Sequence, residues 1–214
     1  MTIEQFVEQH PFLYHMAESS SLDSILKYGL LSTCALLDLY EIIGKKRESI
    51  ECCRRPDSVT IHHPEFGRAV IRDQKPMSDS KLTQCLTDCR PDEWYRFLNS
   101  KVFFWTSATN LSGLLKARAY SSRSHTIFVV DCRRLLEEYF DKIYLCHINS
   151  GAMPYGPTPR GIETFVKISD WPPAIRPRAG GLVKKVVELT VDYSIPNFRS
   201  FLVRVEERKG DNII

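Results

Sequence analysis

The chain has 214 residues, of which 43% are apolar, so it is long enough to form a hydrophobic core without a metal or a disulfide. Its net charge of +3 is too small to identify a partner. The sequence holds no internal repeat and no apolar run of about 20 residues, which excludes a solenoid and a membrane-spanning anchor. A single domain over residues 1–214 is expected.

The cysteines and the first residues of the chain indicate a cytoplasmic protein. Seven cysteines is an odd number without a regular spacing, so we expect reduced thiols. The first residues lack a charged leader followed by an apolar core, so no secretion signal is expected. No metal is expected either, because the cysteine and histidine pairs lack the spacing of a zinc site; these are Cys85 with Cys89, and Cys52-Cys53 with His62-His63.

The first half of the chain is predicted to form short helices around three extended segments. Apolar residues at intervals of three and four predict helices, and alternating or β-branched residues predict strands. In chain order we expect a helix at Ile3–Gln9, an extended segment at Phe12–Ala17, helices at Leu22–Gly29 and Thr33–Ile43, strands at Val59–His62 and Arg68–Arg72, and a helix at Pro91–Leu98.

The second half is predicted to be richer in strands. Strands are expected at Val102–Thr106, Thr126–Asp131, Ile143–Ile148, Glu163–Ile168, Val183–Val191 and Ser200–Glu206, with helices at Leu111–Tyr120 and Arg133–Phe140. Consecutive strands without an intervening helix favour an α+β fold with a largely antiparallel sheet. A Rossmann or P-loop nucleotide site is not expected, because neither glycine-rich motif occurs.

The segment Ser150–Arg160 is rich in glycine and proline and is predicted to be a loop. It is long enough to act as a lid or to recognise an acceptor, and Arg160 and Tyr155 are then its expected contact residues. A plain connecting loop is the alternative, and the sequence does not separate the two.

The first candidate site is the extended segment Tyr14-His15-Met16. On a strand, Tyr14 and Met16 share one face, and His15 points to the other. A histidine that faces a cleft can donate a hydrogen bond to a hydroxyl or carboxylate of a ligand. Taken alone, the segment favours a histidine with a local protein partner instead.

The second candidate is the aromatic strand that contains Phe103, Phe104 and Trp105. Four large apolar residues in a row indicate a strand buried on both faces, or the wall of a pocket. Aromatic rings can stack on a base or on a nicotinamide. We expect at least two of the three rings to belong to the core and one to contact a ligand.

The third candidate is Glu188, within the β-branched run Val186–Val191. Alternation places Glu188 and Thr190 on one face of this strand, opposite three apolar side chains. A carboxylate buried there without a partner is costly, so it has a partner, water or a chemical role. An ordinary glutamate facing solvent is the alternative.

The order and type of these three features resemble the ADP-ribosyltransferase superfamily in its His–aromatic–Glu form. The opening Tyr14-His15…Leu22…Ile25…Gly29-Leu30-Leu31-Ser32 is similar to the start of the toxin-type transferases that modify DNA. The chain also resembles an uncharacterised bacterial family with the same opening, a central Arg-Asp-Gln-x-Pro, a Trp-Tyr…Leu-Asn…Val-Phe-Phe-Trp run and a late Val-Val-Glu-Leu strand. The resemblance covers nearly the whole chain, but only the opening and the late glutamate are tied to chemistry.

The resemblance implies an α+β fold with a largely antiparallel, split β-sheet core and flanking helices. It also implies that NAD is the substrate, cleaved between nicotinamide and ribose through a transition state with cationic character at the sugar. Glu188 would stabilise that cation and orient the acceptor. His15, with Tyr14 and Met16 beside it, would bind NAD through the nicotinamide-side ribose.

The aromatic strand departs from the family pattern. One ring among Phe103, Phe104 and Trp105 would lie over the nicotinamide, where the family usually has a tyrosine. Stacking survives the loss of the tyrosine hydroxyl, whereas a hydrogen bond from that hydroxyl does not.

The toxin-type relatives also use an arginine after the first helical region. Arg47, Arg54, Arg55 and Arg72 are the candidates in this chain. Arg72 is favoured as a catalytic arginine, because it follows a predicted strand and its neighbours could orient the guanidinium for contact with phosphate. An ordinary surface pair with Asp73 is the alternative.

The acceptor implied by the resemblance is a nucleic acid or a protein, and the toxin analogy implies an antitoxin partner. Two further functions stay open. One is a non-catalytic nucleic-acid-binding module that uses the aromatic residues and the basic clusters at Lys45–Arg47, Arg54–Arg55 and Arg176–Lys185. The other keeps the fold but changes the reaction to NAD hydrolysis, or to transfer of an RNA 2′-phosphate to NAD.

Overall fold

The computed structural model describes residues 1–153, 158–173 and 185–214. Its centre is an eight-stranded sheet in the order β12-β11-β6-β1-β5-β9-β7-β8. Every pair of neighbouring strands in this sheet is antiparallel, which confirms the predicted α+β class. The strands are β1 (Phe12–Glu18), β5 (Lys101–Trp105), β6 (Ser124–Asp131), β7 (Ile143–Cys146), β8 (Phe165–Val166), β9 (Glu188–Asp192), β11 (Leu202–Lys209) and β12 (Asn212–Ile213).

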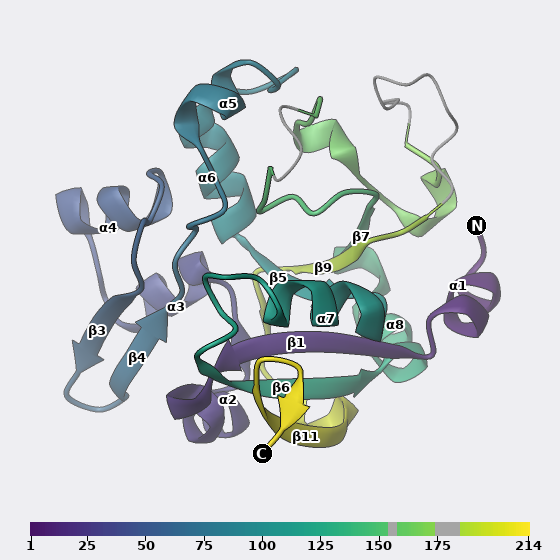
Figure 1. The fold of residues 1–214 in the computed structure, drawn as a ribbon, viewed down its shortest axis with the longest axis horizontal. Helices are drawn as coiled ribbons and strands as arrows, with labels where there is room; N and C mark the ends of the chain where they lie inside the picture. Colours follow the sequence, from purple (N-terminus) through teal and green to yellow (C-terminus); the bar gives the residue numbers. More distant parts are fainter. Residues whose placement is uncertain (154–157, 174–184) are drawn as a thin grey trace.

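The sheet is split between β1 and β5. These two strands are registered at one position, where Tyr14 faces Trp105. In contrast, β1 pairs with β6 along its whole length, and β5 does the same with β9. Figure 1 shows β1, β6 and β11 on one side of this line and β5, β9 and β7 on the other. The predicted split, antiparallel core is therefore present.

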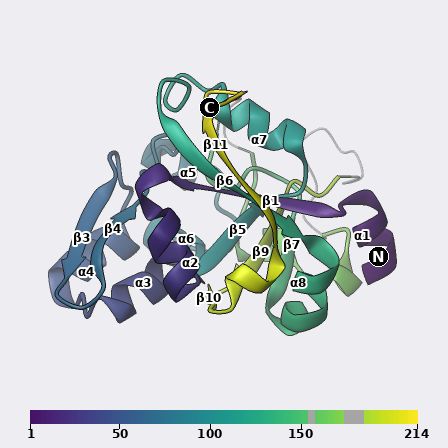
Figure 2. The same ribbon diagram turned by 90° about the horizontal axis from the view of Figure 1, so that it is seen from below.

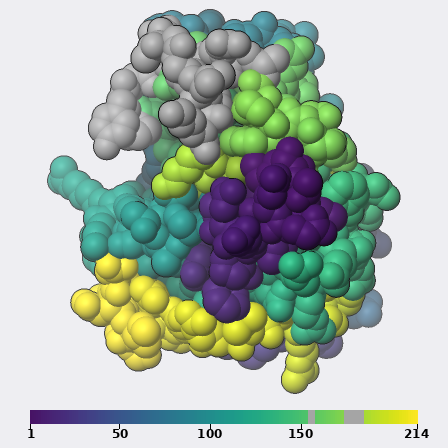
Figure 3. Space-filling model, turned by 90° about the vertical axis from the view of Figure 1, so that its right-hand side faces the viewer, coloured from purple at the N-terminus to yellow at the C-terminus, as the bar shows by residue number. Residues whose placement is uncertain are grey.

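The alternation of side chains along the strands buries both faces of the sheet. On one face, Leu13, Phe104 and Leu189 pack with residues of α8 (Cys132–Tyr139) and with Phe6 of α1 (Ile3–Gln9). Figure 3 shows the N-terminal segment lying on the surface at this end of the molecule. On the other face, side chains of β1, β5 and β6 pack against α7 (Ala108–Leu115).

A second group of elements covers the opposite end of the molecule, as Figure 2 shows. It comprises α2 (Leu22–Tyr28), α3 (Thr33–Leu39), α4 (Gly44–Glu51), the hairpin of β3 (Val59–His63) and β4 (Gly67–Ile71), α5 (Asp79–Thr83) and α6 (Pro91–Asn99). The hairpin packs on α3 and α4 through a separate apolar cluster. This arrangement brings the end of β4 towards the split in the large sheet.

Gly29 ends α2, as its position in the sequence predicts. It adopts a φ of +85°, and a Cβ at this position would lie 2.5 Å from the carbonyl oxygen of Ile195. The close approach allows β2 (Leu30–Leu31) to pair with β10 (Ser194–Ile195). A side chain here would therefore meet both conformational strain and a backbone clash.

Several element boundaries differ from the sequence prediction. The helix predicted over residues 33–43 ends at Leu39, because Glu41 adopts a φ of 54°, and α4 follows as a separate helix. The predicted strand over residues 163–168 is reduced to β8 between two 3-10 turns. The helix predicted from Leu111 begins at Ala108, because the Ser107 hydroxyl caps it. The strand predicted over 183–191 begins at Glu188, and residues 183–184 lie outside the described part of the chain.

No helix in the described ranges combines the length and the hydropathy that a membrane crossing needs. All seven cysteines lie in the described ranges, and none of them forms a disulfide. Within the same ranges, the structure contains no group of three His, Cys, Asp or Glu side chains that could hold a metal ion.

Candidate active site

A pocket of about 370 Å³ opens where β1 and β5 diverge. Its walls come from β1, the connection from α2 to α3, the end of β4, β5, the loop after β7 and the first residue of β9. The split therefore gathers side chains from segments that are far apart in the sequence. The predicted site residues that line this pocket are His15, Met16, Arg72, Phe103, Phe104, Trp105 and Glu188.

His15 bridges the split in the sheet. Its Nδ1 lies 2.8 Å from the carbonyl oxygen of Phe103, in the region where the two strands have stopped pairing. A carbonyl can only accept, so Nδ1 carries the proton. The predicted local partner of this histidine is thus present, and the residue also lines the pocket.

The protonation state of His15 follows from its surroundings. Burial lowers its pKa to about 4, with a smaller lowering by Arg72, although the hydrogen bond to Phe103 raises it. The ring is therefore neutral near pH 7, and Nε2 is a hydrogen-bond acceptor. The sequence analysis expected His15 to donate a hydrogen bond to a ligand. The structure corrects this, because the single N–H of the neutral ring already donates to the carbonyl oxygen of Phe103.

Glu188 is the first residue of β9 and is 5% exposed, which rules out the solvent-facing alternative. It lies opposite Trp105 on β5 and Cys146 on β7. The backbone N–H of Ser150 donates to its Oε2 at 3.2 Å. Burial raises the pKa of Glu188 to about 7, although Ser150 and Arg160 lower it. A carboxyl group with this pKa can be either ionised or protonated near neutral pH, as general acid–base chemistry requires.

The loop after β7 forms the wall next to Glu188. Arg160, predicted to contact a ligand, instead donates from Nη1 to the carbonyl oxygens of Ser150 and Ala152, at 3.0 and 3.1 Å. It is 2% exposed and does not line the pocket. Tyr155, the other predicted contact residue of this loop, lies outside the described residues.

The three aromatic side chains of β5 have different surroundings. Phe104 is 1% exposed and belongs to the main core, where it packs against Phe198. Phe103 and Trp105 are only partly buried and line the pocket. Phe104 is therefore a core residue, whereas Phe103 and Trp105 have exposed surface that a ligand could contact.

Tyr14 and Met16 share one face of β1, as alternation predicts, but differ in their relation to the pocket. Tyr14 is not part of the pocket lining; it packs in the cluster formed with Leu111 and Leu115 of α7. Met16 belongs to the same cluster but also lines the pocket, and its carbonyl oxygen accepts a hydrogen bond from Arg72 Nη1 at 3.2 Å.

Arg72 lies just beyond β4 and reaches the pocket edge. Its guanidinium lies 5.1 Å from the centre of the Tyr120 ring, and its buried Nε has no hydrogen-bond partner among the described residues. Burial lowers the pKa of Arg72, but an arginine in a protein stays charged. Asp73 does not pair with Arg72: it binds the Tyr120 hydroxyl at 2.9 Å and Arg123 at 3.3 Å.

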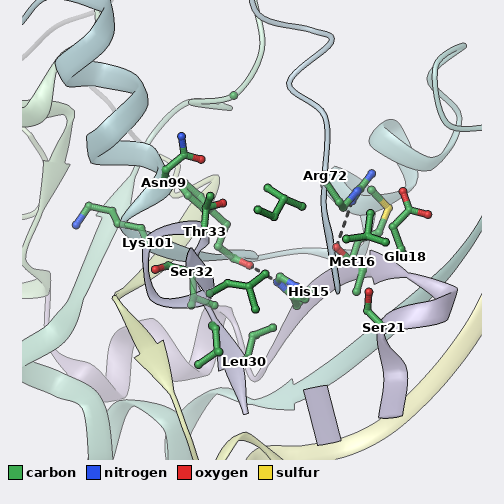
Figure 4. Close-up of a pocket in the computed structure, with 18 of the residues that line it drawn as sticks. His15, Met16, Glu18, Ser21, Leu30, Ser32, Thr33, Arg72, Asn99 and Lys101 are labelled. Carbon is green, nitrogen blue, oxygen red and sulfur yellow. Dashed lines mark hydrogen bonds between the residues drawn. The ribbon is translucent and has the colours of Figure 1, made fainter. Parts of the chain in front are cut away.

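Other polar side chains line the pocket without an earlier signal in the sequence. Figure 4 shows three of them, Ser32, Thr33 and Asn99, on one side of His15, and Glu18 on the other side, near Arg72 and Met16. The Ser32 hydroxyl caps α3 by accepting from the backbone of Ala35. Serine and threonine at a helix start are common, so sequence alone does not distinguish a cap from a pocket residue.

Arg55, another of the four candidate arginines in the sequence, is buried and also lines the pocket. Its Nε donates to the carbonyl oxygen of Arg72 at 3.1 Å, and its Nη1 donates to that of Ile50 at 2.6 Å. Burial lowers its pKa to about 10. Arg55 thus supports the backbone from which Arg72 projects.

The comparisons with known proteins identify a family but not an activity. No curated protein matches the chain. Among solved structures, the chain is similar to the Thermus sp. 2.9 DarT in complex with carba-NAD+, with 12% identity, a TM-score of 0.38, and 92% of this chain and 82% of that chain covered. A likeness this distant carries no argument about the site. A family model matches residues 11–202, so the chain belongs to the family described as a family of unknown function (DUF7002).

Proposed function

We propose that this protein is an ADP-ribosyltransferase that cleaves the nicotinamide–ribose bond of NAD and transfers ADP-ribose to a nucleic acid or a protein. The observation that supports this proposal most strongly is that His15 and Glu188 line one pocket at the split of the sheet. One is a neutral acceptor, and the other is a buried carboxyl group. The pocket combines apolar walls with a few polar groups, as small-molecule sites do.

In the proposed reaction, the bond between the ribose C1′ and the nicotinamide nitrogen breaks, and its electron pair leaves with nicotinamide. Nicotinamide becomes neutral, and the positive charge moves to the ribose. The ionised carboxylate of Glu188 stabilises this charge, and its buried setting strengthens the interaction. The acceptor then attacks C1′, and its proton passes to Glu188 and from there to solvent.

The other residues bind and orient NAD. His15 Nε2 accepts a hydrogen bond from a hydroxyl of the nicotinamide-side ribose, because Nδ1–H is held by Phe103. Phe103 or Trp105 offers a ring face to the nicotinamide. Arg72 directs its unpartnered Nε–H towards the diphosphate.

The proposal is tested with NAD that carries a label in its adenylate half. Wild-type protein is expected to release nicotinamide and to transfer the label to added nucleic acid or protein, and Glu188→Ala is expected to do neither. Release without transfer would indicate NAD hydrolysis, and loss of the phosphate from a 2′-phosphorylated RNA would indicate phosphotransfer. Salt-dependent nucleic-acid binding without nicotinamide release, unchanged in Glu188→Ala, would indicate a binding module instead.

The toxin analogy adds an antitoxin partner to this proposal. If the activity harms its host, expression of wild-type protein is expected to arrest growth, and Glu188→Ala is expected to relieve the arrest. A protein that restores growth by binding the wild-type chain would then be the partner.

A further inference from the structure

Arg160 connects two parts of the chain that meet beside Glu188. Its backbone N–H donates to the carbonyl oxygen of Cys85 at 2.9 Å, and its carbonyl oxygen accepts from Thr87 N–H at 3.0 Å. The main chain of Arg160 thus forms a parallel bridge with Leu86, at the C-terminal side of α5. The base of the side chain is fixed by these contacts.

The guanidinium of Arg160 holds the turn that follows β7. Nη1 donates to the carbonyl oxygens of Ser150 and Ala152, and Nε donates to that of Thr158 at 3.2 Å. These hydrogen bonds need the planar fork of an arginine, which an ammonium group cannot reproduce. The side chain is 2% exposed, so water cannot readily replace them.

Ser150 links these hydrogen bonds of Arg160 to Glu188. Its carbonyl oxygen is held by Arg160, and its N–H donates to Glu188 Oε2 at 3.2 Å. We propose that Arg160 is a positioning residue, whose guanidinium fixes the Ser150–Ala152 turn so that the Ser150 N–H binds and orients the Glu188 carboxylate. The inference rests on the catalytic role of Glu188 in the proposed function.

Because of the groups around Glu188, its pKa reports whether Arg160 still holds the Ser150–Ala152 turn. Trp105 faces it from β5 and is uncharged, and Cys146 faces it from β7 with a pKa well above the usual thiol value, so it stays neutral. Ser150 and Arg160 are the groups of the described chain that lower the pKa of Glu188 against the effect of burial. Loss of the Ser150 hydrogen bond, with the carboxyl group still buried, therefore raises that pKa.

The experiment uses two substitutions that separate charge from geometry. Arg160→Lys keeps the positive charge but loses the fork, and Arg160→Met loses both. Arg54→Lys is the matched control, because Arg54 also holds a loop by donating to a backbone carbonyl, that of Lys75, but lies outside the pocket lining. Each variant is made with Glu188 and with Glu188→Gln, and unfolding free energy is measured from pH 5 to 9.

In each background, the difference between the Glu188 and Glu188→Gln proteins reports the titration of this one carboxyl group. In the wild-type background we expect the difference to stop changing near pH 7. In both Arg160 variants we expect the pH above which this difference is constant to rise by about one unit or more. In the Arg54→Lys background we expect no movement.

If this pH is the same in Arg160→Lys as in the wild-type background, the proposal is overturned, because the positive charge of residue 160 alone would then set the pKa of Glu188. Amide hydrogen exchange at Ser150 gives a second measurement: Arg160→Lys is expected to speed it about tenfold or more, and an unchanged rate would also overturn the proposal. Neither measurement uses NAD, so both can succeed even when the labelled-NAD test fails. If NAD is cleaved, Arg160→Lys is expected to lower kcat with little change in KM.

Discussion

The Nδ1 of His15 donates a hydrogen bond to the carbonyl oxygen of Phe103 across the gap between β1 and β5, at 2.8 Å. One step earlier along β1, Tyr14 still faces Trp105 in regular register. The side chain thus takes the place of the next backbone hydrogen bond and satisfies a carbonyl that the split would leave exposed to the pocket. The same contact fixes the tautomer of His15, so that one interaction serves both the fold and the site.

We expect His15→Ala to weaken NAD binding by about fivefold, because one hydrogen bond in a buried site is worth about 1 kcal/mol. His10→Ala is the matched control: His10 Nδ1 also bonds a backbone carbonyl, that of Thr106 at 2.9 Å, but His10 does not line the pocket. Calorimetric titration with NAD measures the difference. Equal affinities for the two variants would contradict the role given to His15.

The buried Glu188 makes protein stability depend on pH. Its pKa is about 7 in the folded chain against an ordinary 4.5, so the unfolded chain loses this proton first. Stability contributed by the neutral form is therefore complete below pH 4.5 and is lost as the pH rises to about 7. Above pH 7 we expect Glu188→Gln to be more stable than wild type by about 3 kcal/mol, and near pH 4 to be equally stable. Urea unfolding at both pH values checks this, and parallel pH profiles would contradict it.

The rate of NAD cleavage is expected to rise with pH and to level off above about pH 7, as Glu188 ionises. His15 does not affect the pH dependence of the rate in this range, because its pKa is about 4 and the ring is neutral throughout. Initial rates of nicotinamide release between pH 5 and 9, with stability checked at each pH, measure the profile. A rate that falls as the pH rises from 6 to 8 would assign Glu188 the opposite protonation state.

Arg72 is expected to bind the diphosphate half of NAD. Arg72→Lys keeps the charge but loses the fork, so we expect ADP-ribose to bind about tenfold more weakly and nicotinamide to bind unchanged. Arg68→Lys is the control, because Arg68 lies on β4, four residues before Arg72, and donates to the exposed Ser20 hydroxyl outside the pocket. Calorimetry with each ligand makes the comparison. Unchanged ADP-ribose binding in Arg72→Lys would mean that Arg72 does not bind the diphosphate.

Much of the sheet could be predicted from the sequence, because alternation and β-branched residues act locally. The pattern around Phe104 and Glu188 predicts strands, and the structure has them there. Boundaries were less accurate where single turns decide them: the positive φ of Glu41 ends a helix that apolar spacing alone continues.

The site was only partly accessible to sequence reasoning. The residue types His15 and Glu188 indicate chemistry, but their common pocket depends on the split of the sheet, which is a long-range property. Arg160 shows the limit most clearly. Its predicted contact with a ligand followed from its place in a loop, whereas its hydrogen bonds to Ser150 and Ala152 depend on how that loop folds back.

The most direct test of the account is single-turnover nicotinamide release from NAD, with enzyme in excess, for wild type and Glu188→Gln. The substitution keeps the shape of the side chain and removes its negative charge. We predict that wild type releases nicotinamide, and that Glu188→Gln does so at least about a hundredfold more slowly while still binding NAD. Equal release by both proteins, or no binding of NAD by either, would contradict the account.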